Sequence, residues 1–198
     1  FLIQVRKVKN KIPSDCLFKL VIFGDGGVGK TTLVKRYLTG IFDTSTTMTI
    51  GVDFYVKKLM MYGKKVSLQI WDFAGEDRFR FLLPSYVHGA SGGIFMFDIT
   101  RYTSLKSFED WLNIFRNGYH MKQHGNTLPI LMVGGKLDLK YKRSVTHDQA
   151  KKAVQIQNLY DYIECSAKTG ENVEEIFRRL THVLMQRSGV LTQETRTY

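Results

Sequence analysis

Short runs of apolar residues alternate along this chain with segments whose apolar residues recur every three or four positions. A short apolar run predicts a buried β-strand, and the second pattern predicts a helix with one face against a sheet. We expect strands over residues 17–23, 52–60, 65–71, 93–97, 129–133 and 160–164. Helices are expected over residues 30–39, 104–115, 146–157 and 172–186. Strands that alternate with helices are typical of an α/β domain with a mostly parallel sheet.

The connection between the second and third strands departs from the parallel pattern. Tyr62-Gly63-Lys64 separates two strand-like segments and predicts a hairpin, which places one antiparallel strand at the edge of the sheet. Ser104 precedes an amphipathic segment and is expected to cap its helix. The complete prediction is an α/β fold with six strands and five helices, of which the four ranges above are located in the sequence.

The length of 198 residues fits one domain. We expect a folded domain over residues 16–187, a basic extension over residues 1–15 and a tail over residues 188–198. No stretch approaches the roughly 18 apolar residues that span a bilayer. The two cysteines, Cys16 and Cys165, are expected to be reduced thiols, which favours a cytoplasmic location.

The charge balance favours anionic ligands without choosing one. Lysine and arginine total 29 against 18 for aspartate and glutamate, a net charge of +11. Nucleic acid, anionic lipid and phosphorylated ligands all suit such a balance, and solvated loops and helix faces are the simpler explanation. Because Arg6, Lys7, Lys9 and Lys11 lie in the first dozen residues, we expect a weak contact with anionic membranes there. The last residues contain no cysteine, so prenylation is not expected on the chain as given.

Residues 24–31, Gly-Asp-Gly-Gly-Val-Gly-Lys-Thr, match the phosphate-loop pattern G-x-x-x-x-G-K-[ST] between a predicted strand and a predicted helix. Glycines let the backbone turn several N–H groups towards a polyphosphate, and the following helix adds its positive end. Lys30 is expected to reach the β and γ oxygens, and Thr31 to offer its hydroxyl to Mg²⁺. The alternative is a glycine-rich turn with an incidental lysine. The residues expected at the phosphates are Gly26, Gly27, Val28, Gly29, Lys30, Thr31 and Thr32.

Four further segments resemble motifs of the Rab-type small GTPases of the Ras superfamily. Residues 71–79, Trp-Asp-Phe-Ala-Gly-Glu-Asp-Arg-Phe, resemble W-D-T-A-G-Q-E-R-F, and residues 49–54 resemble the first switch of that group. Residues 134–138 resemble G-N-K-x-D, and residues 164–168, Glu-Cys-Ser-Ala-Lys, resemble its base-binding loop. The resemblance implies the G-domain fold of P-loop NTPases and a molecular switch that binds GTP or GDP with Mg²⁺ and hydrolyses GTP.

The resemblance also implies roles at the phosphate end of the site. Thr49 would coordinate Mg²⁺ together with Thr31, and Asp72 would hold a Mg²⁺-bound water. The N–H of Gly75, which the resemblance places in the second switch after Asp72, would contact the γ-phosphate, so that loss of this phosphate frees both switch segments. The expected catalytic residues are Glu76, Lys30 and Gly75.

At the base end, the two acceptor oxygens of Asp138 match the N1–H and N2–H₂ donors of guanine and mismatch adenine. By resemblance, the N–H of Ala167 binds O6, and Lys136 and Lys168 lay their aliphatic stems along the purine faces. Guanine nucleotides are therefore favoured over ATP. The residues expected at the base are Phe42, Lys136, Asp138, Ser166, Ala167 and Lys168.

Three positions leave alternatives open. Gly135 stands where the family uses asparagine to bind the base and brace the phosphate loop, so binding should lose one or two hydrogen bonds of about 0.5–1.5 kcal/mol each, and Gly135→Asn is expected to restore them. Glu76 replaces the glutamine that orients the attacking water; an ionised glutamate either repels the γ-phosphate or polarises the water more strongly. Phe42 is explained either by an edge-on contact with guanine or by the core.

The leading interpretation is a GTP-hydrolysing switch that turns over slowly without an activator and binds effector and regulatory proteins through residues 40–54 and 73–86. The alternative is a pseudo-GTPase, a nucleotide-bound interaction module. A nucleic-acid-binding protein is disfavoured because neither an aromatic RNA-reading motif nor a helix-turn-helix pattern is present. A cytoplasmic protein peripheral to a membrane surface fits these interpretations.

Overall fold

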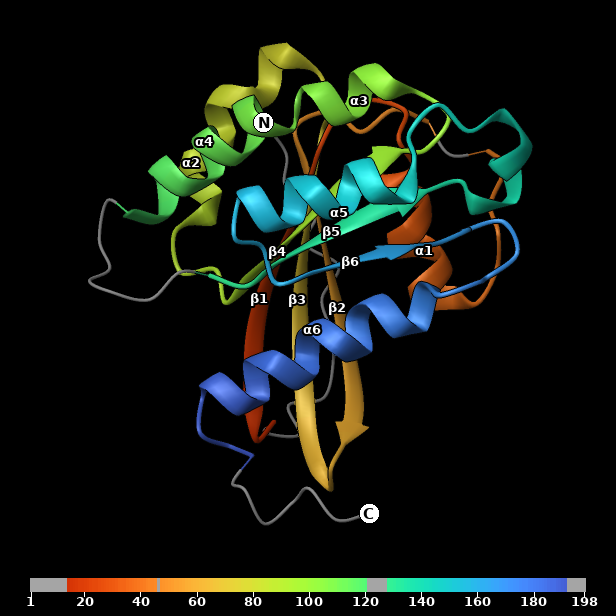
Figure 1. The fold of residues 1–198 in the computed structure, drawn as a ribbon. Coiled ribbons are helices and arrows are strands. Elements are labelled where there is room, and N and C mark those ends of the chain that lie inside the picture. Colours follow the sequence, from red (N-terminus) through yellow and green to blue (C-terminus); the bar gives the residue numbers. More distant parts are fainter. Residues whose placement is uncertain (1–13, 46, 121–127, 192–198) are drawn as a thin grey trace.

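The computed structural model describes residues 14–45, 47–120 and 128–191, which form one six-stranded sheet with helices on both faces (Figure 1). The order across the sheet is β2-β3-β1-β4-β5-β6. β2 pairs antiparallel with β3, and every other neighbouring pair is parallel, as predicted. The strands are β1 (Cys16–Phe23), β2 (Val52–Met61), β3 (Lys64–Phe73), β4 (Gly92–Asp98), β5 (Ile130–Gly135) and β6 (Asp161–Glu164).

The antiparallel edge forms because a two-residue turn joins β2 to β3. Tyr62 and Gly63 have φ angles of 49° and 69°, and the register closes on the pair Met61 and Lys64. Two successive residues with positive φ are typical of the turns whose twist fits a hairpin. The predicted hairpin is confirmed.

The helices cover the two faces of the sheet in unequal numbers (Figure 1). On one face, the core includes residues of α1 (Lys30–Thr39) and α6 (Val173–Arg187). On the other face lie α2 (Leu83–Val87), α3 (Tyr102–Lys106), α4 (Phe108–His120) and α5 (His147–Ile156). Two short 3₁₀ segments, η1 (Asp77–Leu82) and η2 (Leu137–Lys142), follow β3 and β5.

The expected five helices are one too few, since the described residues contain six α-helices. The single helix predicted over residues 104–115 is divided into α3 and α4 at Ser107. The prediction that Ser104 caps this helix is wrong. Ser104 lies inside α3, where its Oγ donates to the carbonyl of Arg101 (2.6 Å) and accepts from the N–H of Asp98 (3.0 Å).

The parallel strands bring the predicted motifs to one edge of the sheet. In an open α/β sheet, the carboxyl ends of the parallel strands form the edge at which ligands bind. The phosphate loop follows β1, Asp72 lies near the end of β3, Asp98 ends β4 and Gly135 ends β5. Every residue of β4 is buried, so the strand end that carries Asp98 is held in place by the core of the domain.

Three expectations about the whole chain can be compared with the structure. Cys16 and Cys165 are free and buried, as expected of reduced thiols. No helix among residues 14–45, 47–120 and 128–191 is long and apolar enough to cross a bilayer. The expected membrane contact of the basic extension falls on residues 1–13, which lie outside the described residues.

Candidate functional site: a phosphate loop and its facing switches

The phosphate loop turns from β1 into α1 as the sequence predicts. Gly29 caps α1 with a φ of 105°, in the left-handed region that favours glycine. The second switch approaches this loop closely at Gly75: its carbonyl accepts from the N–H of Gly26 (2.9 Å), and a Cβ at Gly75 would lie 2.2 Å from backbone atoms of Asp25 and Gly26. Only glycine therefore fits at position 75.

Lys30 is the one buried lysine among the described residues, with 5% of its surface exposed. Its Nζ donates to the carbonyls of Gly24 (2.7 Å) and Asp25 (2.8 Å), which hold the amine within the loop. Burial lowers the pKa of Lys30 to about 8, against the opposing effect of the nearby carboxylates of Asp72 and Asp25. A buried cation of this kind favours an anionic ligand, because an anion restores the charge balance that desolvation opposes.

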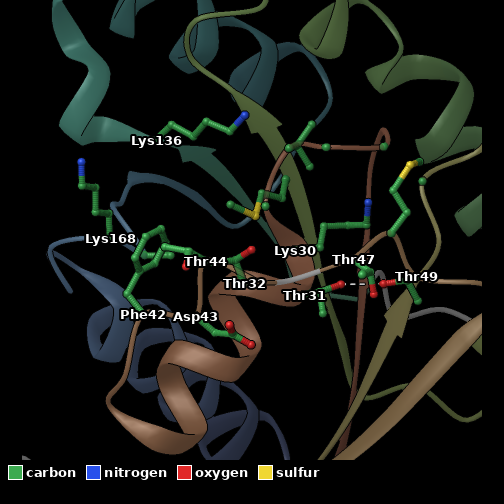
Figure 2. Close-up of a pocket in the computed structure, with 18 of the residues that line it drawn as sticks. Lys30, Thr31, Thr32, Phe42, Asp43, Thr44, Thr47, Thr49, Lys136 and Lys168 are labelled. Carbon is green, nitrogen blue, oxygen red and sulfur yellow. Dashed lines mark hydrogen bonds between the residues drawn. The ribbon is translucent and has the colours of Figure 1, made fainter.

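Three oxygen-bearing side chains from distant parts of the chain converge beside Lys30. The hydroxyl of Thr31 lies 2.6 Å from that of Thr49 and donates to Oδ2 of Asp72 at 2.5 Å. Figure 2 shows the Thr31–Thr49 contact at one end of the pocket. Asp72 is fully buried, and burial raises its pKa to about 6 against the lowering effects of Lys30 and Thr31.

The donor set fits a Mg²⁺ ion. Oδ1 of Asp72 is buried and has no hydrogen-bond partner, although a buried carboxylate oxygen is costly to leave unpaired. Mg²⁺ prefers hard oxygen ligands, takes few from the protein and keeps several waters. The hydroxyls of Thr31 and Thr49 and the carboxylate of Asp72 together offer such oxygens.

At the other end of the pocket, a buried acidic residue, Asp98, anchors the predicted base-binding Lys136. Nζ of Lys136 lies 2.6 Å from Oδ2 of Asp98, a carboxylate that is almost completely buried. Burial would raise the pKa of Asp98, but hydrogen bonds from Lys136 and Thr100 lower it below its ordinary value. Because the amine of Lys136 is anchored, its aliphatic stem is held along the cavity.

Asp138 is oriented by the loop that follows β6. The hydroxyl of Ser166 donates to Oδ1 of Asp138 at 2.7 Å and itself accepts from the N–H of Thr169 at 3.1 Å. Ser166 is completely buried and does not line the cavity, whereas Ala167 and Lys168 do. Ser166 therefore contacts Asp138 and not the cavity, where it was expected to lie against the base.

A single cavity of about 610 Å³ connects the two ends of the site. Figure 2 shows Phe42, Lys136 and Lys168 grouped at one end and Thr31, Thr47 and Thr49 at the other. Phe42 is half-buried and lines this cavity, which favours the base contact over a place in the core. The cavity is lined by all the predicted phosphate-binding residues, by Thr49 and Gly75, and at the base end by Phe42, Lys136, Asp138, Ala167 and Lys168.

Glu76 lies apart from this cavity. It lines a neighbouring cavity of about 590 Å³, which shares Gly26 and Gly75 with the first. There, Glu76 forms an ion pair with Arg78, and Nη2 of Arg101 donates to the carbonyl of Gly26 at 2.7 Å. The sequence analysis did not identify Arg101, because its place beside the phosphate loop depends on the neighbouring positions of β1 and β4.

Sequence reasoning also missed Met96, which lines the main cavity, and Asp98, which anchors the cavity residue Lys136. Asp98 ends the strand that lies next to β5, so its pairing with Lys136 follows from strand order. Met96 lines the cavity although the sequence marks it only as part of a buried strand. A polar residue at the carboxyl end of a predicted parallel strand was the available signal for Asp98.

Comparison with known proteins agrees with this geometry. A model of the Ras family matches residues 19–186. The Ras-related protein Rab-19 of Xenopus laevis is 39% identical over 177 residues, which cover 89% of this chain and 80% of that protein. The Ras-related protein Rab-30 of Homo sapiens is 41% identical over 164 residues, which cover 82% of this chain and 77% of that protein. The chain therefore belongs to the Ras family and is a small GTPase of its Rab branch.

Proposed function

We propose that this protein binds GDP and GTP with Mg²⁺ in the 610 Å³ cavity and hydrolyses GTP as a slow molecular switch. The observation that carries the proposal is the convergence of Thr31, Thr49 and Asp72 beside the buried Lys30. These four side chains provide the oxygens for a divalent cation and the positive charge for a polyphosphate.

In this proposal, each part of the chain has a defined task. Lys30 and the N–H groups of the phosphate loop bind the phosphate oxygens, and Thr31, Thr49 and Asp72 hold Mg²⁺, directly or through water. When bound, Mg²⁺ neutralises charge on the phosphates. Because Thr49 belongs to the first switch and Gly75 to the second, a γ-phosphate that contacts both would order the two segments together.

Guanine selectivity is proposed to reside in Asp138, held by Ser166. An ionised carboxylate only accepts hydrogen bonds, and guanine presents two adjacent donors on one edge, whereas adenine presents a donor and an acceptor. Ala167 lines the same end of the cavity, with its backbone N–H available in the loop that follows β6. The stems of Lys136 and Lys168 and the ring of Phe42 provide apolar surface for the purine.

A second candidate, a pseudo-GTPase, is favoured by the position of Glu76. Its carboxylate is engaged by Arg78 and lines the neighbouring cavity, so the residue expected to orient water is drawn away from the main cavity. In this alternative, the nucleotide serves as a structural ligand of an interaction module. The two candidates share the binding site and differ only in turnover.

The proposed partners are effector and regulatory proteins that contact residues 40–54 and 73–86. Four large apolar side chains in these segments are exposed: Ile41, Met48, Ile50 and Phe81. Exposed apolar groups in segments that respond to a γ-phosphate would provide a nucleotide-dependent contact surface. A cytoplasmic location, with peripheral contact to a membrane, is proposed from the relationship to the Rab branch.

The test is to extract the nucleotide that copurifies with the protein and then follow its turnover. We expect GDP or GTP in the extract, and weak competition by ATP in a binding assay. Lys30→Ala should weaken nucleotide binding at least about tenfold, because it removes a charge-assisted hydrogen bond. Equal affinities for GTP and ATP would contradict guanine selectivity. Single-turnover hydrolysis of bound GTP separates the switch, which turns over, from the pseudo-GTPase, which does not.

A further inference from the structure

Met96 lines the cavity, and Gly135 lies beside it on the neighbouring strand. β4 and β5 run parallel, with Met96 opposite Val133 and Asp98 opposite Gly135. Side chains two residues apart on a strand point to the same face. The side chain of Met96 therefore lies on the face to which a side chain at position 135 would point.

The methyl group of Met96 occupies the space that a side chain at position 135 would need. A Cβ built on Gly135 would lie 2.5 Å from Cε of Met96 and 3.1 Å from the carbonyl oxygen of Val28. Carbon atoms in contact are normally about 3.5–4.0 Å apart. The space that glycine leaves free at position 135 is thus filled by the methyl end of Met96.

The same methyl group also reaches the phosphate loop. Cε of Met96 lies 3.5 Å from the position of a Cβ on Gly29, the residue that precedes α1. Met96 is 1% exposed, and its backbone lies where β1 gives way to the loop. One thioether side chain therefore packs between the loop at Gly29 and the end of β5 at Gly135. Methionine suits such a gap because its chain is unbranched and flexible.

We propose that Met96 is a positioning residue for the phosphate loop, which it braces against the end of β5 by apolar contact in the space left open by Gly135. The proposal deepens the proposed function, since the braced loop is the one that would bind the nucleotide phosphates. It also changes an expectation from the sequence. Gly135→Asn alone should weaken nucleotide binding, because the new side chain must displace the methyl end of the buried Met96 and crowd the carbonyl oxygen of Val28 in the phosphate loop.

A double-mutant cycle tests this pairing on the full chain, with GDP affinity as the readout. Met96→Val shortens the side chain and should weaken GDP binding about tenfold by leaving the loop unsupported, and Gly135→Asn should also weaken it about tenfold by overpacking. The combined variant has room for the asparagine and should bind GDP within about threefold of wild type. Independent effects would multiply to about a hundredfold loss.

Two control variants separate positioning of the loop from general stability. Met96→Leu keeps the volume and should retain GDP affinity. Met132→Val makes the same substitution at another buried methionine, on β5 but in the cluster on the opposite face of the sheet. Met132→Val should lower the unfolding temperature without changing GDP affinity and without coupling to Gly135→Asn. A fall in GDP affinity for Met132→Val equal to that for Met96→Val would contradict a specific role for Met96.

Thermal unfolding without nucleotide provides a second readout. It is measured for wild type, Met96→Val, Gly135→Asn and the combined variant. Gly135→Asn should lower the unfolding temperature, and Met96→Val should restore it in the combined variant. If wild-type protein binds no GDP while this restoration is observed, the proposed function is wrong and the pairing stands. Stronger GDP binding by Gly135→Asn alone, or a combined loss equal to the product of the single losses, would overturn the pairing.

Discussion

Nε of Arg78 lies 2.8 Å from Oε2 of Glu76, so this carboxylate, which lines the neighbouring cavity, has a counterion two residues along the same segment. The side chain of Arg78 is 67% exposed and that of Glu76 is 29% exposed. Exposed ion pairs are worth little and exchange readily with solvent or a partner. The ion pair therefore restrains the side chain of Glu76 only loosely.

The first prediction is that Glu76→Gln accelerates single-turnover hydrolysis of bound GTP by about tenfold. Glutamine can both accept from water and donate to the transferring phosphoryl group, and it removes the repulsion between a carboxylate and the γ-phosphate. A tenfold change corresponds to about 1.4 kcal/mol, the scale of one hydrogen bond. The measurement is phosphate release from preloaded protein without a partner.

Arg78→Ala is the control for this prediction. If Arg78 only offsets the charge of Glu76, its removal slows the wild-type protein and leaves the Glu76→Gln protein unchanged. Rapid partner-free hydrolysis by wild type that is slowed by Glu76→Gln would instead identify Glu76 as a water-polarising base.

The second prediction concerns the metal dependence of nucleotide binding. Asp72→Asn preserves the shape of the side chain but removes the buried charge that Thr31 and Lys30 face. Wild-type protein should lose GDP affinity by at least about tenfold when a chelator removes Mg²⁺, and Asp72→Asn should show a smaller difference. Titration of GDP with and without chelator measures both values. Asp148→Asn changes an exposed aspartate of α5 and should behave like wild type.

The third prediction separates a base-binding residue from its support. Asp138→Ala should weaken GDP binding by about a hundredfold, since two hydrogen bonds to a charged group are lost. Ser166→Ala should weaken it by about tenfold, because Oδ1 of Asp138 loses the hydroxyl that orients it. In competition between GTP and ATP, Asp138→Ala should lose more of the preference for GTP than Ser166→Ala. Unchanged selectivity in Asp138→Ala would place guanine recognition elsewhere.

The sheet and the phosphate loop could be predicted because their determinants are local. An apolar run, a glycine-rich turn and the start of a helix lie within one continuous segment, and parallel strands place such segments at one edge. The division of the helix at Ser107 could not be predicted in this way. The hydroxyl of Ser107 donates to Oδ1 of Asp25 at 2.7 Å, and Asp25 also accepts from Nε1 of Trp111 at 2.8 Å. These partners are distant in sequence, so only the folded chain brings them together.

At the site, too, contacts between residues that are distant in sequence could not be predicted. The sequence shows that Gly135 lacks the side chain with which the family binds the base. It does not show that the methyl group of Met96, on the neighbouring strand, fills the space beside Gly135. Likewise, the anchoring of Lys136 depends on Asp98 of β4. The sequence shows which side chains differ from the family, and tertiary packing decides whether each difference is compensated.

The last prediction concerns the support of the base-binding loop and its response to acid. Arg143 makes two hydrogen bonds of 2.7 Å to Glu164, and the hydroxyl of Tyr162 donates to the same carboxylate at 2.7 Å. Burial alone would raise the pKa of Glu164, but these hydrogen bonds, with a contribution from His147, lower it below its ordinary value. Glu164 ends β6 and directly precedes the loop that carries Ser166.

A carboxylate whose pKa is lower in the folded state stabilises the protein at pH above its unfolded pKa of about 4.3, and this contribution is lost as the pH falls through the folded pKa. Glu164→Gln should therefore lower the free energy of unfolding by about 1–3 kcal/mol at neutral pH. The difference in the free energy of unfolding between wild type and Glu164→Gln should shrink as the pH falls below about 4.3. Thermal unfolding across this pH range measures the effect, with Glu109→Gln, at an exposed position of α4, as a control outside the loop. A constant difference between wild type and Glu164→Gln at every pH would show that packing around the side chain, and not its charge, supports the loop.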